Sequence, residues 1–188
     1  MENRPELTLG FVGKICSGKG TTVSYLVENK GFYASSCSDR IREEILRNGQ
    51  EITRETLQET AGRMRKEFGP DVLAQRTWEH ILQNGTQKAI VDSIRGIEEV
   101  NFLKILPKFY LIAIEADQKI RFERILSRGI PGDPKTWEDF IKAESRDLNK
   151  DGRNIEACLQ AADFKIENNG TEKELYQKLD RMLANLPT

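Results

Sequence analysis

The sequence lacks three features that would place the protein outside the ordinary globular class. It has only three cysteines, Cys16, Cys37 and Cys158, an odd number at wide spacing that fits neither a disulfide framework nor a zinc knuckle. Its longest strongly apolar run, 109–114, is far shorter than the ~18 residues that a membrane helix needs. The first six residues carry charge and proline where a signal peptide needs an apolar stretch. We therefore expect a cytoplasmic protein with no disulfide scaffold and no membrane partner.

The sequence also lacks an excess of charge of either sign. Its 29 Lys and Arg residues are balanced by 30 Asp and Glu residues, for a formal net charge of -1. A domain that binds polymeric nucleic acid is usually net basic, so we exclude nucleic acid as the main partner. The 188 residues fit one domain. Nothing in the sequence indicates the oligomeric state.

Short apolar runs alternate with amphipathic segments along the chain. Strands are expected over 7–12, 32–35, 88–92, 109–115 and 163–167. Helices are expected over 21–29, 39–48, 53–68, 71–83, 97–105, 118–128, 133–148 and 154–161, with a last one after a capping box at Thr171. The helix at 133 is expected to begin with Asp133 as N-cap and Pro134 at its first position. This alternation predicts an α/β fold with a five-stranded parallel sheet and helices on both faces.

The most specific motif is a glycine-rich turn between the first strand and the first helix. Gly13 to Thr21 reads Gly-Lys-Ile-Cys-Ser-Gly-Lys-Gly-Thr, which has the Gly-x-x-x-x-Gly-Lys spacing of a phosphate-binding P-loop. Backbone N–H groups and the helix N-terminus attract phosphate here, and the Lys19 ammonium neutralises the outer phosphates. We expect the same positive charge to lower the pKa of the Cys16 thiol. The predicted ATP contacts in this turn are Gly13, Lys14, Ser17, Gly18, Lys19, Gly20, Thr21 and Thr22.

Gly20 departs from the usual motif, which has Ser or Thr directly after the lysine to bind Mg²⁺. The run Gly-Lys-Gly-Thr instead resembles adenylate kinase and its nucleoside monophosphate kinase relatives. The resemblance continues in the strand and Asp-x-x-Arg helix of 31–44. It continues also in Asp92-Ser-Ile-Arg95, a shortened form of Asp-Gly-x-Pro-Arg, and in Arg124-Ile-Leu-Ser-Arg128-Gly. It implies an ATP:nucleotide phosphotransferase that uses ATP and Mg²⁺ as cofactors and acts on a small-molecule nucleotide acceptor.

The resemblance also implies a role for each matching side chain. Arg42 and Arg95 would bind the acceptor phosphate, with Asp39 and Asp92 as further acceptor-side residues. Catalytic roles would fall to Lys19, to Arg124 on the ATP base, to Arg128 on the transferring phosphate, and to Arg146 on the next helix. Mg²⁺ would be held without a direct protein ligand set, through Thr21, Asp92 and waters. The resemblance divides the single 1–188 P-loop kinase domain into a core, an acceptor-binding insertion at 39–84 and a short lid at 129–136.

Each of these side chains also has a possible structural or solvent-exposed role. Arg124 and Arg128 share a helix face and could be a solvated basic stripe, while Asp39 suits a helix N-cap. Lys142 and Arg146 also share a face, and either could contact phosphate or form ion pairs with Glu138 or Asp139. The basic residues of 52–83, which include Arg54, Arg63 and Arg65, are interpreted mainly as a solvated face balanced by nearby glutamates.

A second resemblance concerns the C-terminal end. The segment 162–171, followed by a helix, is similar to the last strand and turn of dephospho-coenzyme A kinase, and we expect Asn169 and Gly170 at the ATP site. The leading prediction is transfer of the ATP γ-phosphoryl group to a (deoxy)nucleoside monophosphate. Two alternatives remain: a dephospho-coenzyme A kinase, and an ATP-binding regulatory switch or weak ATPase.

Overall fold

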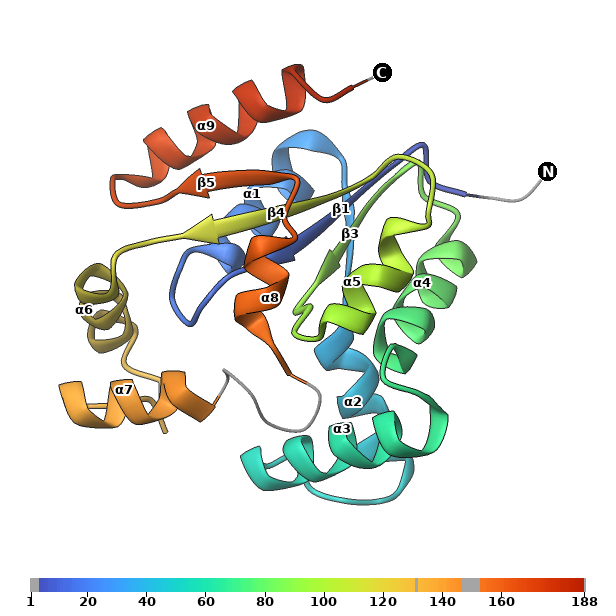
Figure 1. Cartoon of the computed structure of the whole chain (residues 1–188), viewed down its shortest axis with the longest axis vertical. Helices are drawn as coiled ribbons and strands as arrows, with labels where there is room; N and C mark the ends of the chain where they lie inside the picture. The colour runs from blue at the N-terminus through green and yellow to red at the C-terminus, as the bar shows by residue number, and fades with distance from the viewer. Residues whose placement is uncertain (1–3, 131, 147–152, 188) are drawn as a thin grey trace.

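The structure of the protein, a computed structural model, describes residues 4–130, 132–146 and 153–187, with the Arg146 side chain outside the description. A five-stranded sheet in the order β2-β3-β1-β4-β5 forms its centre (Figure 1). Every neighbouring pair of these strands is parallel. The strands are β1 (Leu7–Val12), β2 (Tyr33–Ser36), β3 (Lys88–Asp92), β4 (Phe109–Glu115) and β5 (Phe164–Glu167). The predicted fold class is confirmed.

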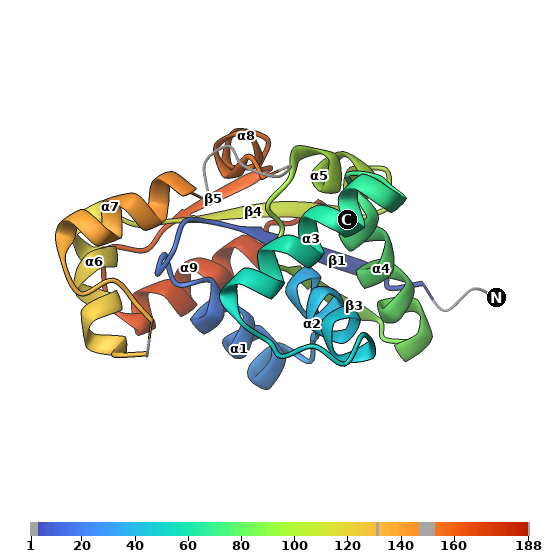
Figure 2. The ribbon, with the colours of Figure 1, turned by 90° about the horizontal axis from the view of Figure 1, so that it is seen from below.

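Helices cover both faces of this sheet. They are α1 (Lys19–Lys30), α2 (Cys37–Arg47), α3 (Arg54–Phe68), α4 (Val72–Asn84), α5 (Ile97–Lys104), α6 (Gln118–Arg128), α7 (Trp137–Arg146), α8 (Ile155–Gln160) and α9 (Glu172–Ala184). Figure 2 shows α1 and α9 on one side of the sheet and α5 and α8 on the other. Because both faces are covered, the central strands are apolar along nearly their whole length, as parallel strands usually are.

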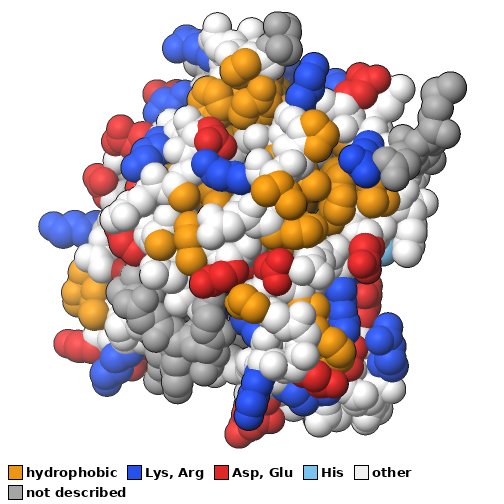
Figure 3. All heavy atoms as spheres, turned by 45° about the vertical axis from the view of Figure 1, so that its right-hand side comes forward, with side chains coloured by type: hydrophobic (Ala, Val, Ile, Leu, Met, Phe, Trp, Pro, Cys, Tyr) orange, Lys and Arg blue, Asp and Glu red, His pale blue; other side chains and the backbone are white. Residues whose placement is uncertain are grey.

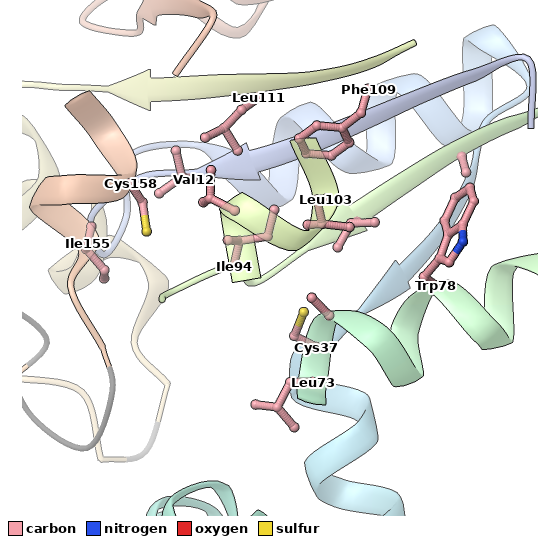
Figure 4. Close-up of a cluster of buried hydrophobic side chains, with 14 of the residues drawn as sticks. Val12, Cys37, Leu73, Trp78, Ile94, Leu103, Phe109, Leu111, Ile155 and Cys158 are labelled. Atoms are coloured by element: carbon pink, nitrogen blue, oxygen red, sulfur yellow. The ribbon is translucent and has the colours of Figure 1, made fainter. Parts of the chain in front are cut away.

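Two apolar clusters, one on each face, hold the layers together. On one face Leu9, Phe11 and Ile112 pack with Leu26 of α1 and Leu179 of α9. The other cluster joins the opposite side chains of the same strands to α4, α5 and α8, and Figure 4 shows part of it. Alternate residues of one strand therefore supply two different cores, which fixes the register of the sheet.

The order of the strands places the loops after β1 and β3 side by side. β1 pairs with β3 on one side and with β4 on the other. The chain continues from β1 into α1 on one face of the sheet and from β3 into α5 on the other face, which opens a crevice between the two loops. In open parallel sheets the crevice at the carboxyl ends of such strands is the usual ligand site. The glycine-rich turn and Asp92 both lie at this edge.

Most expected elements are present with small shifts at their ends, but the start of α7 is a correction. Asp133 does not cap this helix, because its carboxylate accepts from Nε and Nη2 of Arg128 at 2.9 and 2.7 Å. The cap is Thr136, whose hydroxyl oxygen accepts from the backbone N–H of Asp139 at 3.1 Å, and the helix begins at Trp137. The predicted end near residue 148 lies outside the described residues.

Two surface features complete the fold. On the face that Figure 3 shows, basic and acidic side chains are interspersed, as the balanced composition suggests. Within the described ranges, none of the helices has both the length and the apolar character needed to cross a membrane.

Candidate functional site

The turn after β1 is a tightly constrained loop that wraps around the Lys19 side chain. Lys19 Nζ donates to the carbonyl oxygens of Gly13 at 2.7 Å and Lys14 at 3.2 Å, so the ammonium is held at the loop. A Cβ at Gly13 would lie 2.4 Å from the Ile114 carbonyl oxygen, which makes glycine a steric requirement there. The loop also passes through the left-handed region at Cys16, with φ of 56°. These constraints give the turn the curled backbone that a P-loop needs.

Asn168, which sequence reasoning missed, fastens this loop to the end of β5. Its buried side-chain Nδ2 donates to the Ser17 carbonyl oxygen at 2.8 Å. A Cβ at Gly18 would lie 2.1 Å from the same nitrogen, and Gly18 has φ of 106°. Asn169 points elsewhere, because its Oδ1 accepts from the backbone N–H of Asp117 at 2.8 Å. Of the two residues expected at the ATP site, only Gly170 lines the cavity beside the loop.

Three arginines of α6 approach the loop from the other side. Arg124 Nη2 donates to the Asn168 carbonyl oxygen at 2.9 Å, and Arg128 is held by Asp133. Both line the cavity beside the loop, and the roles that the resemblance gives them stay predictions. Arg121, one helical turn before Arg124, is buried and was not considered from the sequence, although its spacing places it on the same face.

Arg121 connects α7 to the phosphate-binding loop. Its Nη1 donates to the Ile15 carbonyl oxygen at 3.3 Å and pairs with the Glu144 carboxylate of α7. Its guanidinium also lies over the Phe140 ring, 5.5 Å from the centroid. The crest of the loop is therefore braced by the helix that follows the short 129–136 segment.

The loop, α6 and the segments after β3 and β5 enclose a cavity of about 870 Å³, which we call the donor cavity. This volume lies within the range of about 300–1,000 Å³ typical of small-molecule sites. Its lining includes Gly13, Ser17, Gly18, Lys19, Gly20, Thr21, Asp92, Arg95, Arg124, Arg128, Gly170 and Leu175. Besides Asn169, two predicted ATP contacts, Lys14 and Thr22, are absent from this lining. Lys14 pairs with Glu156 at 3.4 Å, and Thr22 is buried in α1.

Asp92 carries the polar atom best placed to accept a metal-bound water. Its Oδ1 is buried and has no hydrogen-bond partner among the described residues, while Oδ2 accepts from Ser93 Oγ at 3.3 Å. The Ser17 hydroxyl in the same cavity is likewise buried without a described partner. Buried carboxylates require a partner, and Mg²⁺ typically binds through one or two carboxylates, waters and substrate phosphates. The donor cavity therefore fits Mg²⁺ held by Asp92 through water.

A second cavity of about 240 Å³, which we call the arginine cavity, adjoins the first. The two cavities share Ile15, Ser93 and Arg95 in their linings. Arg54, Leu57, Gln58, Ala61 and Arg65 contribute one continuous face of α3, spaced at three, four, seven and eleven residues. Helix α2 contributes Cys37, Ser38 and Ile41, and Arg153 completes the arginine set. Part of the basic segment interpreted as solvated therefore faces a cavity.

Arg65 is fixed in this cavity by a buried carboxylate that the sequence did not reveal. Its Nη2 donates to Glu99 Oε1 at 2.8 Å, and the two side chains are 8% and 0% exposed. Glu99 Oε2 accepts from the backbone N–H groups of Arg95 and Gly96 at 2.9 and 3.1 Å. Glu99 thereby ties α3 to the loop after β3, at the point where the two cavities meet.

Arg42 and Asp39, expected to bind the acceptor, are not brought into either cavity. Arg42 Nη1 donates to Ser38 Oγ at 2.8 Å and to Asp39 Oδ1 at 3.1 Å, on the exposed side of α2. Ser36 rather than Asp39 is the N-cap of this helix, because its hydroxyl accepts from the Ser38 backbone N–H at 3.1 Å. Of the four expected acceptor residues, the structure brings together Asp92 and Arg95. The side chain of Arg146 lies outside the described residues.

The expectation for Cys16 is also corrected. Burial raises the pKa of this thiol above its ordinary value, and this effect exceeds the opposing influence of Arg128 and Lys19. The nearby Asp133 carboxylate raises the pKa further. Desolvation therefore outweighs the positive charge of the loop.

The fold and the glycine-rich turn define a P-loop protein, and comparison with known proteins places it in a family. Residues 12–141 match the family described as AAA domain, and the chain belongs to this family. Similar curated proteins include UPF0200 proteins. One from Hyperthermus butylicus is 33% identical over 186 residues, which cover 99% of this chain and 98% of the relative. Another, from Staphylothermus marinus, is 36% identical over 164 residues and covers 87% and 85%.

Solved structures with low sequence identity share the fold. TT1252 from Thermus thermophilus gives a TM-score of 0.59 at 18% identity and covers 98% of this chain and 100% of that one. Shikimate kinase from Aquifex aeolicus gives 0.54 at 15% identity and covers 95% and 96%. The chain is thus a UPF0200 protein with a P-loop kinase-type fold. The narrower resemblances to adenylate kinase and dephospho-coenzyme A kinase stay predictions.

Proposed function

We propose that the protein transfers the γ-phosphoryl group of ATP to an anionic small molecule of nucleotide type, with a (deoxy)nucleoside monophosphate as the leading acceptor class. The observation that carries this proposal is the junction of the two cavities. A P-loop cavity on one side and an arginine-lined cavity on the other meet at Ile15, Ser93 and Arg95. A protein that only binds or hydrolyses ATP needs the first cavity but has no use for the second.

In the proposed reaction, an acceptor oxygen forms a bond to the γ-phosphorus while the bond from that phosphorus to the departing ADP oxygen breaks. Such transfer depends mainly on positioning and charge neutralisation, since it requires little covalent chemistry from the protein. Lys19 and the N-terminus of α1 bind the phosphates. An acceptor that is already an ionised phosphate needs no strong general base.

The charged residues that line the two cavities are consistent with separate donor and acceptor sites. Arg124 and Arg128 approach the donor cavity from α6, and Arg95 stands where donor and acceptor would meet. Mg²⁺, when bound, supplies further neutralisation of the ATP phosphates, and Asp92 is placed to hold its waters. Leu175 and Gly170 offer a partly apolar wall beside Arg124, which suits the base of ATP.

A panel assay tests the proposal. ATP, Mg²⁺ and each (deoxy)nucleoside monophosphate or dephospho-coenzyme A are incubated with the protein, and ADP release is compared with and without acceptor. Release that depends on an acceptor, with a matching phosphorylated product, is the expected result. Release that ignores every acceptor would instead favour the ATPase or switch.

Two lysine variants make the panel specific to the P-loop. Lys19→Met should reduce turnover by at least two orders of magnitude, on the scale of losing a preorganised electrostatic contact. Lys30→Met changes a lysine at the opposite end of the same helix, where it pairs with Asp180 at 2.8 Å, and should leave turnover nearly unchanged.

A further inference from the structure

One face of α3 forms a long wall of the arginine cavity, with a cation at each end. Arg54 and Arg65 are eleven residues apart, which is about three turns, or ~16 Å of helix. Between them lie Leu57, Gln58 and Ala61, which are neutral. Among the described residues that line this cavity, none is Asp or Glu. The wall therefore has an arginine at each end and neutral side chains between them.

The end at Arg65 is the one that faces the donor. Arg65 is paired with Glu99, which neutralises its charge, and Glu99 also accepts from the backbone N–H of Arg95, so the loop that carries Arg95 is fixed at this end. Arg95 also lines the donor cavity. An anionic group bound at this end would lie next to the ATP phosphates.

The end at Arg54 is three turns farther from Glu99 and differs in its surroundings. Arg54 is exposed, and its guanidinium forms no ion pair with a carboxylate in the described part of the chain. Arg63, on the same helix but not in the cavity lining, pairs with Glu44 at 3.6 Å and Glu67 at 3.9 Å. Arg54 thus has its charge available, whereas Arg63, on another face of α3, is neutralised locally.

We propose that the acceptor carries two anionic groups joined by a neutral spacer, one bound by Arg95 beside the donor and the other bound by Arg54. This inference rests on the proposed function and narrows its acceptor class. The acceptor is a nucleotide-type molecule with a second phosphate or carboxylate remote from the phosphorylated end. Arg54 on α3 and Arg95 on the loop that Glu99 ties to α3 form a bivalent site, so the second contact is made at high effective concentration.

Alkane phosphonates of graded length provide the test. The donor cavity is first filled with a non-hydrolysable ATP analogue and Mg²⁺, and this titration by calorimetry reports on the donor site alone. Alkane bisphosphonates, with one phosphonate at each end, are then titrated into the loaded protein beside monophosphonates of the same chain length. At the best length, the bisphosphonate should bind about tenfold or more tightly than its monophosphonate partner.

Three variants assign that gain to particular residues. Arg54→Gln should remove the gain and leave monophosphonate affinity unchanged, because Arg54 is exposed and binds only the distal group. Arg95→Gln should weaken both probes, whereas Arg63→Gln, the matched control on α3, should alter neither. Circular dichroism of each variant checks that the fold is retained.

The outcomes separate this inference from the proposed function. Equal affinity of the two probes at every length, binding of neither probe, or a gain that survives Arg54→Gln would overturn the two-anion acceptor while leaving phosphotransfer intact. Failure of the ATP analogue to bind would overturn the proposed function, and the inference with it.

Discussion

Glu99 is a fully buried carboxylate whose conversion to glutamine should destabilise the fold by about 3–5 kcal/mol, the usual cost of breaking a buried ion pair from one side. From the residues that the structure describes, the side chain accepts three hydrogen bonds. One oxygen accepts from Arg65 at 2.8 Å, and the other accepts from the backbone N–H groups of Arg95 and Gly96 at 2.9 and 3.1 Å. Glutamine has the same size, so packing is preserved and the change isolates charge and hydrogen bonding.

The magnitude follows from the geometry of the amide. A glutamine has one acceptor oxygen and one NH₂ donor, whereas all three partners of Glu99 are donors. Either orientation therefore places an NH₂ group against a donor, either Arg65 or the two backbone N–H groups. Each lost hydrogen bond to a charged group is worth about 1.5–3 kcal/mol, and leaving a buried donor unsatisfied adds to this.

Urea denaturation of the wild type and Glu99→Gln measures the difference, from the shift in the midpoint at constant slope. The matched control is Glu67→Gln on α3, whose exposed carboxylate is 3.9 Å from Arg63 and should contribute about 0.5 kcal/mol or less. If Glu99→Gln costs less than about 1 kcal/mol, like an exposed pair, the interpretation of Glu99 as the brace between α3 and the loop after β3 is wrong.

Three further predictions concern the loop and α2. Gly18→Ala should impair folding and ATP binding, because its Cβ would lie 2.1 Å from Asn168 Nδ2; Gly20→Ala, with no heavy atom within 4 Å, should be neutral or slightly stabilising, and the reverse order in thermal melts would contradict this. Alkylation of Cys16, followed by peptide mapping across pH, should have its midpoint above that of free cysteine, because the raised pKa keeps the thiol protonated at neutral pH; a midpoint below it would show that loop charge dominates. Arg42→Ala should change acceptor KM less than twofold and stability by about 0.5 kcal/mol or less, since its contacts are exposed and local; a large KM increase would restore it to the acceptor site.

Local patterns were sufficient for most of the fold. The bounds expected from the sequence are confirmed for β1, β3, β4 and α6. Each is an apolar or amphipathic run that ends at a charged residue or is followed by a glycine. The last helix begins at the predicted capping box of Thr171 and Glu174. The predicted start of α7 was wrong because the Asp133 carboxylate had two possible hydrogen-bond partners. The sequence favoured the backbone of the next helix, but the Arg128 side chain, five residues earlier, binds the carboxylate instead.

For the candidate site, too, some residues followed from local sequence patterns and others only from tertiary contacts. The sequence by itself determined the P-loop, because the spacing of Gly13, Gly18 and Lys19 is a local requirement of a chain that must curl around an anion. The sequence could not identify Arg65 or Glu99 as a buried pair, because helical periodicity defines a helix face but does not show which part of the protein that face packs against. Only the tertiary structure decided that α3 lies against the loop after β3, which buries Arg65 with Glu99 and leaves Arg42 in solvent. Burial decides whether a charge must be paired, and burial arises from contacts between residues far apart in the chain.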